Sequence, residues 1–224
     1  MPKEQEIQTT VNLYATCMEE IKKRTEAIRM IYDKKYSTPF PITNIEFMAL
    51  QLRKILELIA LGNLVANRKQ YETVRKSFRT DWNAKPIIKT IKQINPNYFP
   101  VGVRRKPSKY PKVVCEWENK AENTLTEELF EKAYDEMSCV LHSKNPFSNN
   151  EENLLGINLR IVQYVSLIIN LLNEHTISLC NGDVLNCTME AYAPENPQIK
   201  KVSVHYFGKV NETEVETILK EKNN

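Results

Sequence analysis

Residues 45–66 read IEFMALQLRKILELIALGNLVA, and this stretch decides the fold class. It is apolar on nearly every face, because only Arg53, Lys54 and Glu57 are charged after its first turn. A helix of this composition is buried, so we expect residues 45–66 at the centre of a helical bundle. Arg53 and Glu57 lie four residues apart on one helical face. We expect them to form an ion pair or to share a polar partner, since an uncompensated buried charge is costly.

Helical patterns also occupy most of the chain around this stretch. Residues 152–174 are rich in Leu, Ile and Val and predict a second buried helix. Capping boxes, in which a Ser or Thr is followed three residues later by Glu, predict helix starts at Thr43, Thr124 and Ser148. Apolar residues recur every three or four positions in three further segments, which predict amphipathic helices over 7–32, 86–94 and 124–142.

The pattern changes after His175, where apolar and polar residues begin to alternate with the period of a β-strand. Asn181-Gly182 separates two such runs and predicts a hairpin with a two-residue type I′ turn. Residues 202–206 alternate again and predict a third strand. The expected fold class is therefore mainly α, a helical bundle with a C-terminal three-stranded antiparallel β-meander. The expected division is 1–175 for the bundle, with a basic loop insertion at about 95–120, and 176–224 for the meander and a short C-terminal helix.

The composition and the N-terminal sequence predict where in the cell the protein is found. The 224 residues carry a net charge of +3 and begin without the apolar core of a secretory signal. The most apolar stretch, 161–172, is shorter than the roughly 20 residues that cross a bilayer. Five cysteines without a Cys-x-x-Cys pair predict reduced thiols, and not a disulfide framework or a zinc site. We therefore expect a cytoplasmic protein without membrane contact, metal or cofactor.

Charge is distributed very unevenly along the chain. Residues 68–112 contain thirteen Lys and Arg against two carboxylates, a net charge of +11, whereas residues 113–159 contain ten carboxylates against three lysines, a net charge of −7. A basic segment with interspersed aromatic residues supplies the phosphate contacts and base stacking that single-stranded nucleic acid requires. The alternatives are that the acidic region pairs with the basic one, or that the charges lie on a solvated face. The nucleic-acid-binding candidates are Arg104, Arg105, Lys106, Lys109, Lys112, Tyr98 and Tyr110.

Two motifs resemble those of the HEPN superfamily of small helical proteins. They are Arg-Lys-Ile-Leu-Glu at 53–57 and Cys-Val-Leu-His-Ser-Lys-Asn-Pro-Phe at 139–147, and the resemblance covers about residues 1–175. It implies a link to bacterial defence, toxin and RNA-processing systems. Active members carry an Arg followed by a His four to six residues later, and here no arginine precedes a histidine at that distance. The resemblance thus implies an inactive or divergent member whose polar site contains Arg53, Glu57, His142 and Asn145.

Three functions are open on this sequence. The leading one is a non-catalytic or cryptic RNA-binding or single-stranded nucleic-acid-binding protein of a bacterial or phage defence system. One alternative is a metal-independent ribonuclease that uses His142 with Arg53; Cys139, three residues before His142, carries no nucleophile signature. The other alternative is a protein-interaction module with internally paired charges. Apolar bundles with exposed seams often associate symmetrically, so we also expect a homodimer.

Overall fold

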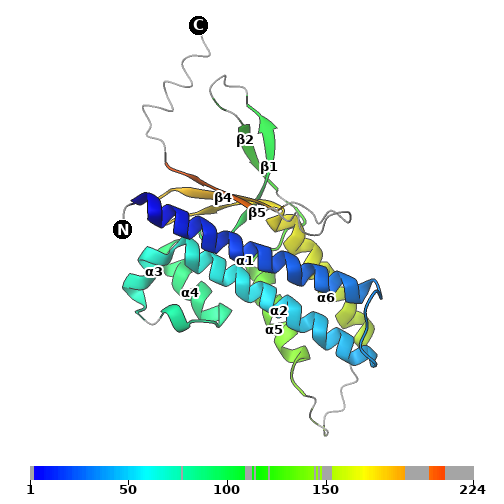
Figure 1. The fold of residues 1–224 in the computed structure, drawn as a ribbon. Helices are drawn as coiled ribbons and strands as arrows, with labels where there is room; N and C mark the ends of the chain where they lie inside the picture. Colours follow the sequence, from blue (N-terminus) through cyan, green and yellow to red (C-terminus); the bar gives the residue numbers. More distant parts are fainter. Residues whose placement is uncertain are drawn as a thin grey trace.

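The computed structural model describes residues 3–76, 78–108, 113, 115–120, 122–143, 145, 147, 153–189 and 202–209. Figure 1 shows α1 and α2 running side by side, with α3 and α4 near one end of α2 and the sheet lying over α1. The elements in chain order are α1 (Lys3–Tyr32), α2 (Pro41–Ala66), α3 (Arg68–Val74), a 3₁₀ turn (Phe78–Thr80), α4 (Ala84–Ile94), β1 (Val101–Pro107), β2 (Cys115–Asn119), α5 (Glu127–Val140), α6 (Leu154–Leu172), β3 (Glu174–Ser178), β4 (Val184–Met189) and β5 (Val202–Phe207).

α2 is the central helix, as its composition predicts. It packs against α1, α4, α5 and α6, and Leu52 and Ile55 are fully buried. Its start differs from the prediction, because the helix begins at Pro41 and the Thr43 hydroxyl donates back to the Phe40 carbonyl at 2.9 Å. The capping box predicted at Thr43 is therefore wrong. Proline's fixed φ suits the first turn of a helix, so the N-cap is Phe40, three residues before the predicted one.

The helix starts predicted further along the chain are shifted. At the start of α5, Thr126 and not Thr124 accepts a hydrogen bond, from the Leu129 N–H at 3.2 Å. Asn153 caps α6, whereas the cap predicted at Ser148 lies outside the described residues. α3 has no counterpart in the sequence prediction, because its short polar sequence carries no apolar stripe.

α6 is only partly buried, in contrast to the predicted second central helix. Ile161, Ile168 and Leu171 face the core, but only six of the 19 residues of α6 are buried. By length and composition alone α6 also meets the requirement for a membrane span, a test that core helices of water-soluble proteins pass as well. The helix ends at Leu172, two residues earlier than predicted, because Glu174 already begins β3.

The antiparallel sheet has five strands in the order β2-β1-β3-β4-β5, so the prediction of three strands is wrong. The predicted meander forms as β3-β4-β5. β1 pairs with β3 at Val101 and Thr176 and then continues into a hairpin with β2, in the region predicted to be a basic loop. The sheet thus draws on both of the regions predicted as separate units. Three consecutive exposed cations hide the alternation of β1: Arg104, Arg105 and Lys106.

The turn between β3 and β4 lies where the sequence predicts it but has another geometry. The Gly182 N–H donates to the Leu179 carbonyl at 2.9 Å, and the Leu179 N–H donates to the Asp183 carbonyl at 2.8 Å. Gly182 has a φ of +85°, whereas Asn181 is not among the described residues with positive φ. A type I′ turn needs positive φ at both central residues, so this is a three-residue loop with a left-handed glycine. Asn181 instead accepts a bond from the Asp183 N–H at 3.1 Å, which favours ordinary φ.

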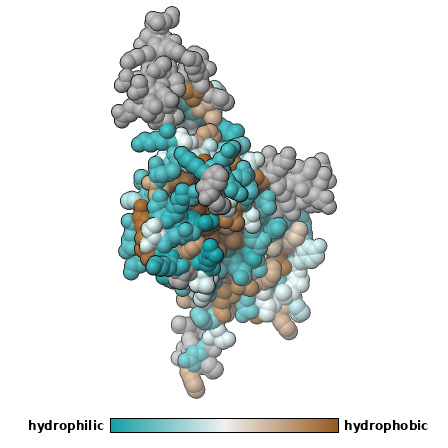
Figure 2. All heavy atoms as spheres, turned by 60° about the vertical axis from the view of Figure 1, so that its left-hand side comes forward, coloured by the Kyte–Doolittle hydropathy of each residue, from teal (hydrophilic) through white to brown (hydrophobic). Residues whose placement is uncertain are grey.

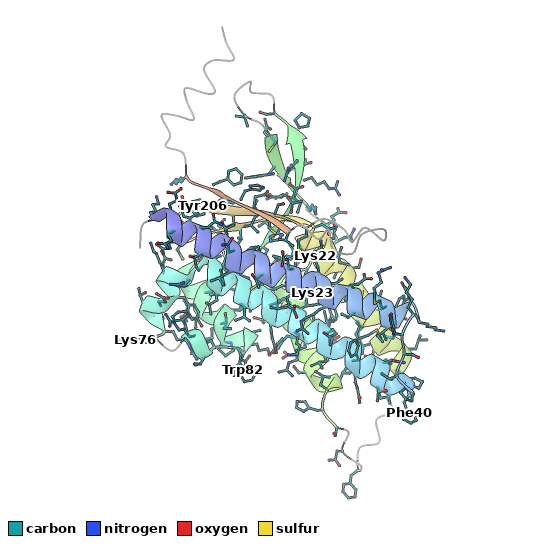
Figure 3. The ribbon with its side chains drawn as sticks, in the orientation of Figure 1. Lys22, Lys23, Phe40, Lys76, Trp82 and Tyr206 are labelled. Atoms are coloured by element: carbon teal, nitrogen blue, oxygen red, sulfur yellow. The ribbon has the colours of Figure 1, made fainter. Side chains whose placement is uncertain are left out.

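The surface mixes polar and apolar residues. Figure 2 shows a face on which hydrophilic residues predominate and hydrophobic residues surface in patches. Figure 3 places exposed Phe40 at one end of the bundle, and Lys76 and Trp82 on the side of α3 and α4. The short C-terminal helix predicted beyond β5 lies outside the described residues.

Candidate functional site

The first candidate is a polar cluster where α2 meets α5. Arg53 Nε donates to Glu57 Oε1 at 3.3 Å, which confirms the predicted pair. Tyr134 of α5 completes the cluster, because its hydroxyl lies 3.4 Å from both Arg53 Nη2 and Glu57 Oε1. The guanidinium carbon also lies 5.1 Å from the centre of the Tyr134 ring. Sequence reasoning missed Tyr134, since nothing in the α5 pattern distinguishes it from a core residue.

The two other predicted polar-site residues do not join this cluster. His142 and Asn145 are exposed beyond the C-terminal end of α5. Asn145 Oδ1 accepts a local bond from the Phe147 N–H at 3.0 Å. Among the residues that the structure describes, no hydrogen bond or ion pair links His142 or Asn145 to Arg53 or Glu57. The structure thus does not bring His142 and Asn145 together with Arg53 and Glu57 in one polar site.

The second candidate is the basic segment, residues 68–112. Of its thirteen Lys and Arg, eleven are described, and seven of these pair with a carboxylate of the same chain. Lys76, Lys89 and Arg104 make no ion pair with a described residue, and Arg79 lies over the Phe78 ring at 5.7 Å. The pairs are Arg68 with Glu72, Lys69 with Glu6, Arg75 with Asp81, Lys85 with Asp135, Lys92 with Glu127, Arg105 with Glu174 and Lys106 with Glu118.

Two of these pairs join the basic α4 to the acidic α5. Lys92 Nζ lies 2.6 Å from Glu127 Oε1, and Lys85 Nζ lies 2.5 Å from Asp135 Oδ1. The bond to Glu127 and the charge of this carboxylate raise the pKa of Lys92 above its ordinary value. A cleft of about 420 Å³ runs between the two helices and is lined by charged residues of both. The acidic region thus pairs with the basic one within a single chain.

The hairpin of β1 and β2 carries three of the five cations that the sequence predicts as phosphate-binding residues. Arg104 is exposed, Arg105 Nε lies 2.5 Å from Glu174 Oε1, and Lys106 bonds Glu118. Tyr98 is different, because its side chain is fully buried in the core beside Phe99, with ring centres 5.9 Å apart. No base can reach a buried ring, which corrects the assignment of Tyr98 as a stacking residue. The remaining candidates lie outside the described residues: Lys109, Tyr110 and Lys112.

The core also contains a cluster of titratable side chains that the sequence pattern did not predict. Tyr14 Oη and His175 Nε2 lie 2.8 Å apart, and His175 Nδ1 lies 2.9 Å from the Leu172 carbonyl oxygen. A carbonyl only accepts, so Nδ1 carries the hydrogen and Nε2 accepts from Tyr14. Burial lowers the pKa of His175 to about 4 and raises that of Cys187, its partner across β3 and β4, to about 12. Both side chains are closed off from solvent, so we assign them to stability.

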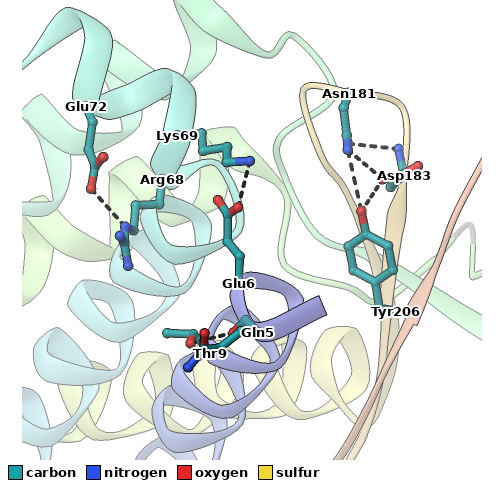
Figure 4. Close-up of polar contacts among 9 residues, drawn as sticks. All are labelled: Gln5, Glu6, Thr9, Arg68, Lys69, Glu72, Asn181, Asp183 and Tyr206. Atoms are coloured by element: carbon teal, nitrogen blue, oxygen red, sulfur yellow. Dashed lines mark hydrogen bonds and ion pairs between the residues drawn. The ribbon is translucent and has the colours of Figure 1, made fainter. Parts of the chain in front are cut away.

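A second group of polar contacts lies beside the β3-β4 turn (Figure 4). It consists of an ion pair between α1 and α3 and of hydrogen bonds at the turn. Glu6 Oε2 of α1 lies 2.7 Å from Lys69 Nζ of α3. In the turn, Asp183 accepts bonds from the Tyr206 hydroxyl and the Asn181 side chain, and from the Lys209 N–H at 2.9 Å. Desolvation raises the pKa of Asp183, but these bonds outweigh it and hold the pKa below its ordinary value. Glu6 and Asp183 each have a polar partner within the same chain, which is typical of a structural role.

A hollow with a mainly apolar lining lies elsewhere, between α1 and α6. It has a volume of about 400 Å³. Ile21, Ile28 and Tyr32 line it from α1, and Val165 and Ile169 line it from α6. Size and lining match those of sites that take an apolar ligand or side chains of a partner. Sequence reasoning missed it, because it expected α6 to be enclosed.

Comparison with protein-family models, with curated proteins and with solved structures finds no match to this chain. The HEPN-like resemblance therefore stays a hypothesis that depends on the two sequence motifs.

Proposed function

We propose that this protein is a non-catalytic interaction module. Its basic segment is held by carboxylates of its own chain, and the apolar face of α1 and α6 is the surface left for a partner. The observation that carries the proposal is the pairing of seven of the eleven described cations in the basic segment. The net charge of +11 already counts Glu72 and Asp81, so the five pairs with carboxylates outside the segment lower it to +6 (11 − 5).

A nucleic acid has to compete with these carboxylates for the cations of the basic segment. Binding to nucleic acid gains free energy when a cation neutralises a phosphate and releases its condensed counterion. A cation that already holds a carboxylate must first exchange that partner. Exposed ion pairs contribute at most about 1 kcal/mol each, so one pair is a small obstacle but several together offset much of the gain.

One observation favours a second candidate, binding of RNA or single-stranded DNA. Arg104 is exposed and makes no ion pair with a described residue, and it lies next to Arg105 and Lys106 in the hairpin of β1 and β2. Figure 1 shows this hairpin projecting from the body of the molecule, where a polyanion has access to it. The HEPN-like resemblance, with its link to defence systems, points to the same class of ligand.

Fluorescence anisotropy with a labelled single-stranded RNA and its DNA equivalent tests the choice. We expect no saturable binding by the purified full chain, even at low salt. Binding that weakens with salt at a log-log slope of about −0.7 per contact would overturn the proposal in favour of the second candidate.

Two triple variants identify the surface if binding is seen. Replacement of Arg104, Arg105 and Lys106 by Ala should abolish binding at the hairpin. The matched control replaces Lys76, Arg79 and Lys89 by Ala, which removes the same charge from the α3-α4 side. Equal losses in both variants would mean that net charge, and not the hairpin, holds the nucleic acid.

A further inference from the structure

α6 presents an apolar stripe that no described element covers. Leu155 and Leu159 are 70% and 56% exposed, and Ile169 is 40% exposed. With Val162 and Ser166 these positions are spaced alternately four and three residues apart. This is the spacing with which one helix packs along another in a coiled coil. The hollow between α1 and α6 adjoins the stripe and shares Val162 and Ile169 with it.

The stripe carries no charge. Arg160 is the sole charged residue of α6, and its Nε lies 3.3 Å from Glu136 Oε2 of α5. On the rim, Arg29 of α1 bonds Glu26 at 2.6 Å, so both signs of charge occur there together. An uncharged stripe with a rim of mixed sign does not repel an identical surface. It also lacks the one-sided charge that would select an acidic or a basic partner.

We propose that a second copy of this chain docks on this face, with the two α6 helices antiparallel about a two-fold axis near residue 164. The inference rests on the proposed function, in which the apolar face binds a partner, and identifies that partner as a second copy of the chain. Two-fold symmetry about that point places Leu159 opposite Ile169 of the other copy and Val162 opposite Ser166. Each Leu159 then enters the hollow beside the partner's α6, which supplies the pocket that an interface anchor needs.

The area of the apolar face on α6 determines how tightly two copies are expected to associate. From Leu155 to Ile169 the stripe spans 14 residue steps, or about 21 Å at 1.5 Å per residue. With a width of two helices, roughly 20 Å, each copy contributes roughly 420 Å². The two copies together reach roughly 840 Å², below the level of about 1,000 Å² expected for a stable specific interface and within the range of weak, transient association. The dimer should therefore be reversible and dependent on concentration.

Sedimentation of the full chain over about a hundredfold range of concentration tests the dimer. Leu159→Glu and Ile169→Lys should each weaken association by at least about tenfold, because each buries an unpaired charge. The double variant should regain part of the loss, because the antiparallel arrangement sets each Glu opposite a Lys. Val74→Glu is the matched control, since Val74 is 58% exposed at the end of α3, and it should leave association unchanged.

Each contrary outcome has a definite meaning. A chain that is monomeric throughout, or a dimer insensitive to both single variants, overturns the second copy as the occupant. A monomer that instead sediments with phosphatidylcholine vesicles also overturns it and assigns the face to a lipid surface. These results leave the proposed function standing unless the same protein also binds RNA through Arg104, Arg105 and Lys106, which would overturn the function itself.

Discussion

α2 and α6 look alike in the sequence and differ in the folded protein. Both are rich in Leu and Ile and nearly free of charge, yet α2 is surrounded by α1, α4, α5 and α6, whereas α6 packs on α2 and on the inner strands β1, β3 and β4 of the sheet. The outer side of α6 therefore stays exposed. Apolar composition shows that a helix has enough hydrophobic surface for burial, but the number of neighbours decides how much is buried.

The largest expected effect on stability comes from truncating a leucine in α2, and the same change in α6 gives a direct comparison of the two helices. Leu52→Ala in α2 removes a fully buried side chain and should lower the free energy of unfolding by about 2 to 5 kcal/mol. Leu159→Ala on the outer side of α6 should change it by less than about 0.5 kcal/mol. Urea unfolding followed by circular dichroism measures both, at a low protein concentration that keeps the proposed dimer dissociated. Equal losses would mean that α6 is enclosed like α2.

The junction between α6 and β3 should respond to pH. His175 has a pKa of about 4 when folded and roughly 6.5 when unfolded, so the unfolded chain binds the extra proton between these values. The contribution of His175 to the free energy of unfolding should be fully present above pH 6.5. It should fall by about 3 kcal/mol as the pH drops towards 4. Denaturant melts between pH 5 and 7 isolate the histidine from most carboxylates.

His205 provides the control for the pH dependence. It is exposed in β5, so His205→Ala should keep the slope of stability against pH. His175→Gln, which removes the buried ring, should flatten that slope whatever its effect on overall stability. An unchanged slope in His175→Gln would show that another group causes the acid sensitivity.

The polar face of α2 should contribute less than its apolar faces. Tyr134→Phe removes the hydroxyl that lies 3.4 Å from both Arg53 and Glu57 while it keeps the ring. These contacts are long and the Arg53 and Glu57 side chains are 26% and 20% exposed, so we expect a loss of about 1 kcal/mol or less. Tyr36→Phe at an exposed position is the matched control in thermal melts. A loss several times larger would mark the cluster as buried in solution.

The smallest effect should come from the pairs between α4 and α5. Replacement of Lys85 and Lys92 by Gln should lower the melting temperature slightly at low salt, because two ion pairs to α5 are lost. The difference should vanish at roughly 1 M salt, where the Debye length is about 3 Å. Replacement of Lys76 and Lys89, which make no ion pair with a described residue, is the matched control. A loss that persists in high salt would show that packing of the lysine stems, and not charge, joins the helices.

The sequence by itself determined the elements whose signals are local. The period of apolar residues located α1, α2, α4 and α5, and alternation around Asn181-Gly182 located the meander, because each pattern needs only neighbours along the chain. The pair of Arg53 and Glu57 follows for the same reason, since four residues of helix bring the two side chains together. Turn geometry and helix ends shifted where a nearby proline or side-chain bond outweighed the expected signal.

Tertiary structure decided everything that depends on distant segments. Tyr134 reaches Arg53 from 81 residues away, and His175 reaches Tyr14 from 161 residues away, so neither contact leaves a mark in the local pattern. The pairing of the basic segment with carboxylates of α1, α5 and the sheet is equally invisible in a count of charges. The sequence shows which residues are apolar or charged. Their burial and their partners depend on how the helices and strands pack in space. In this protein the packing leaves one side of α6 exposed.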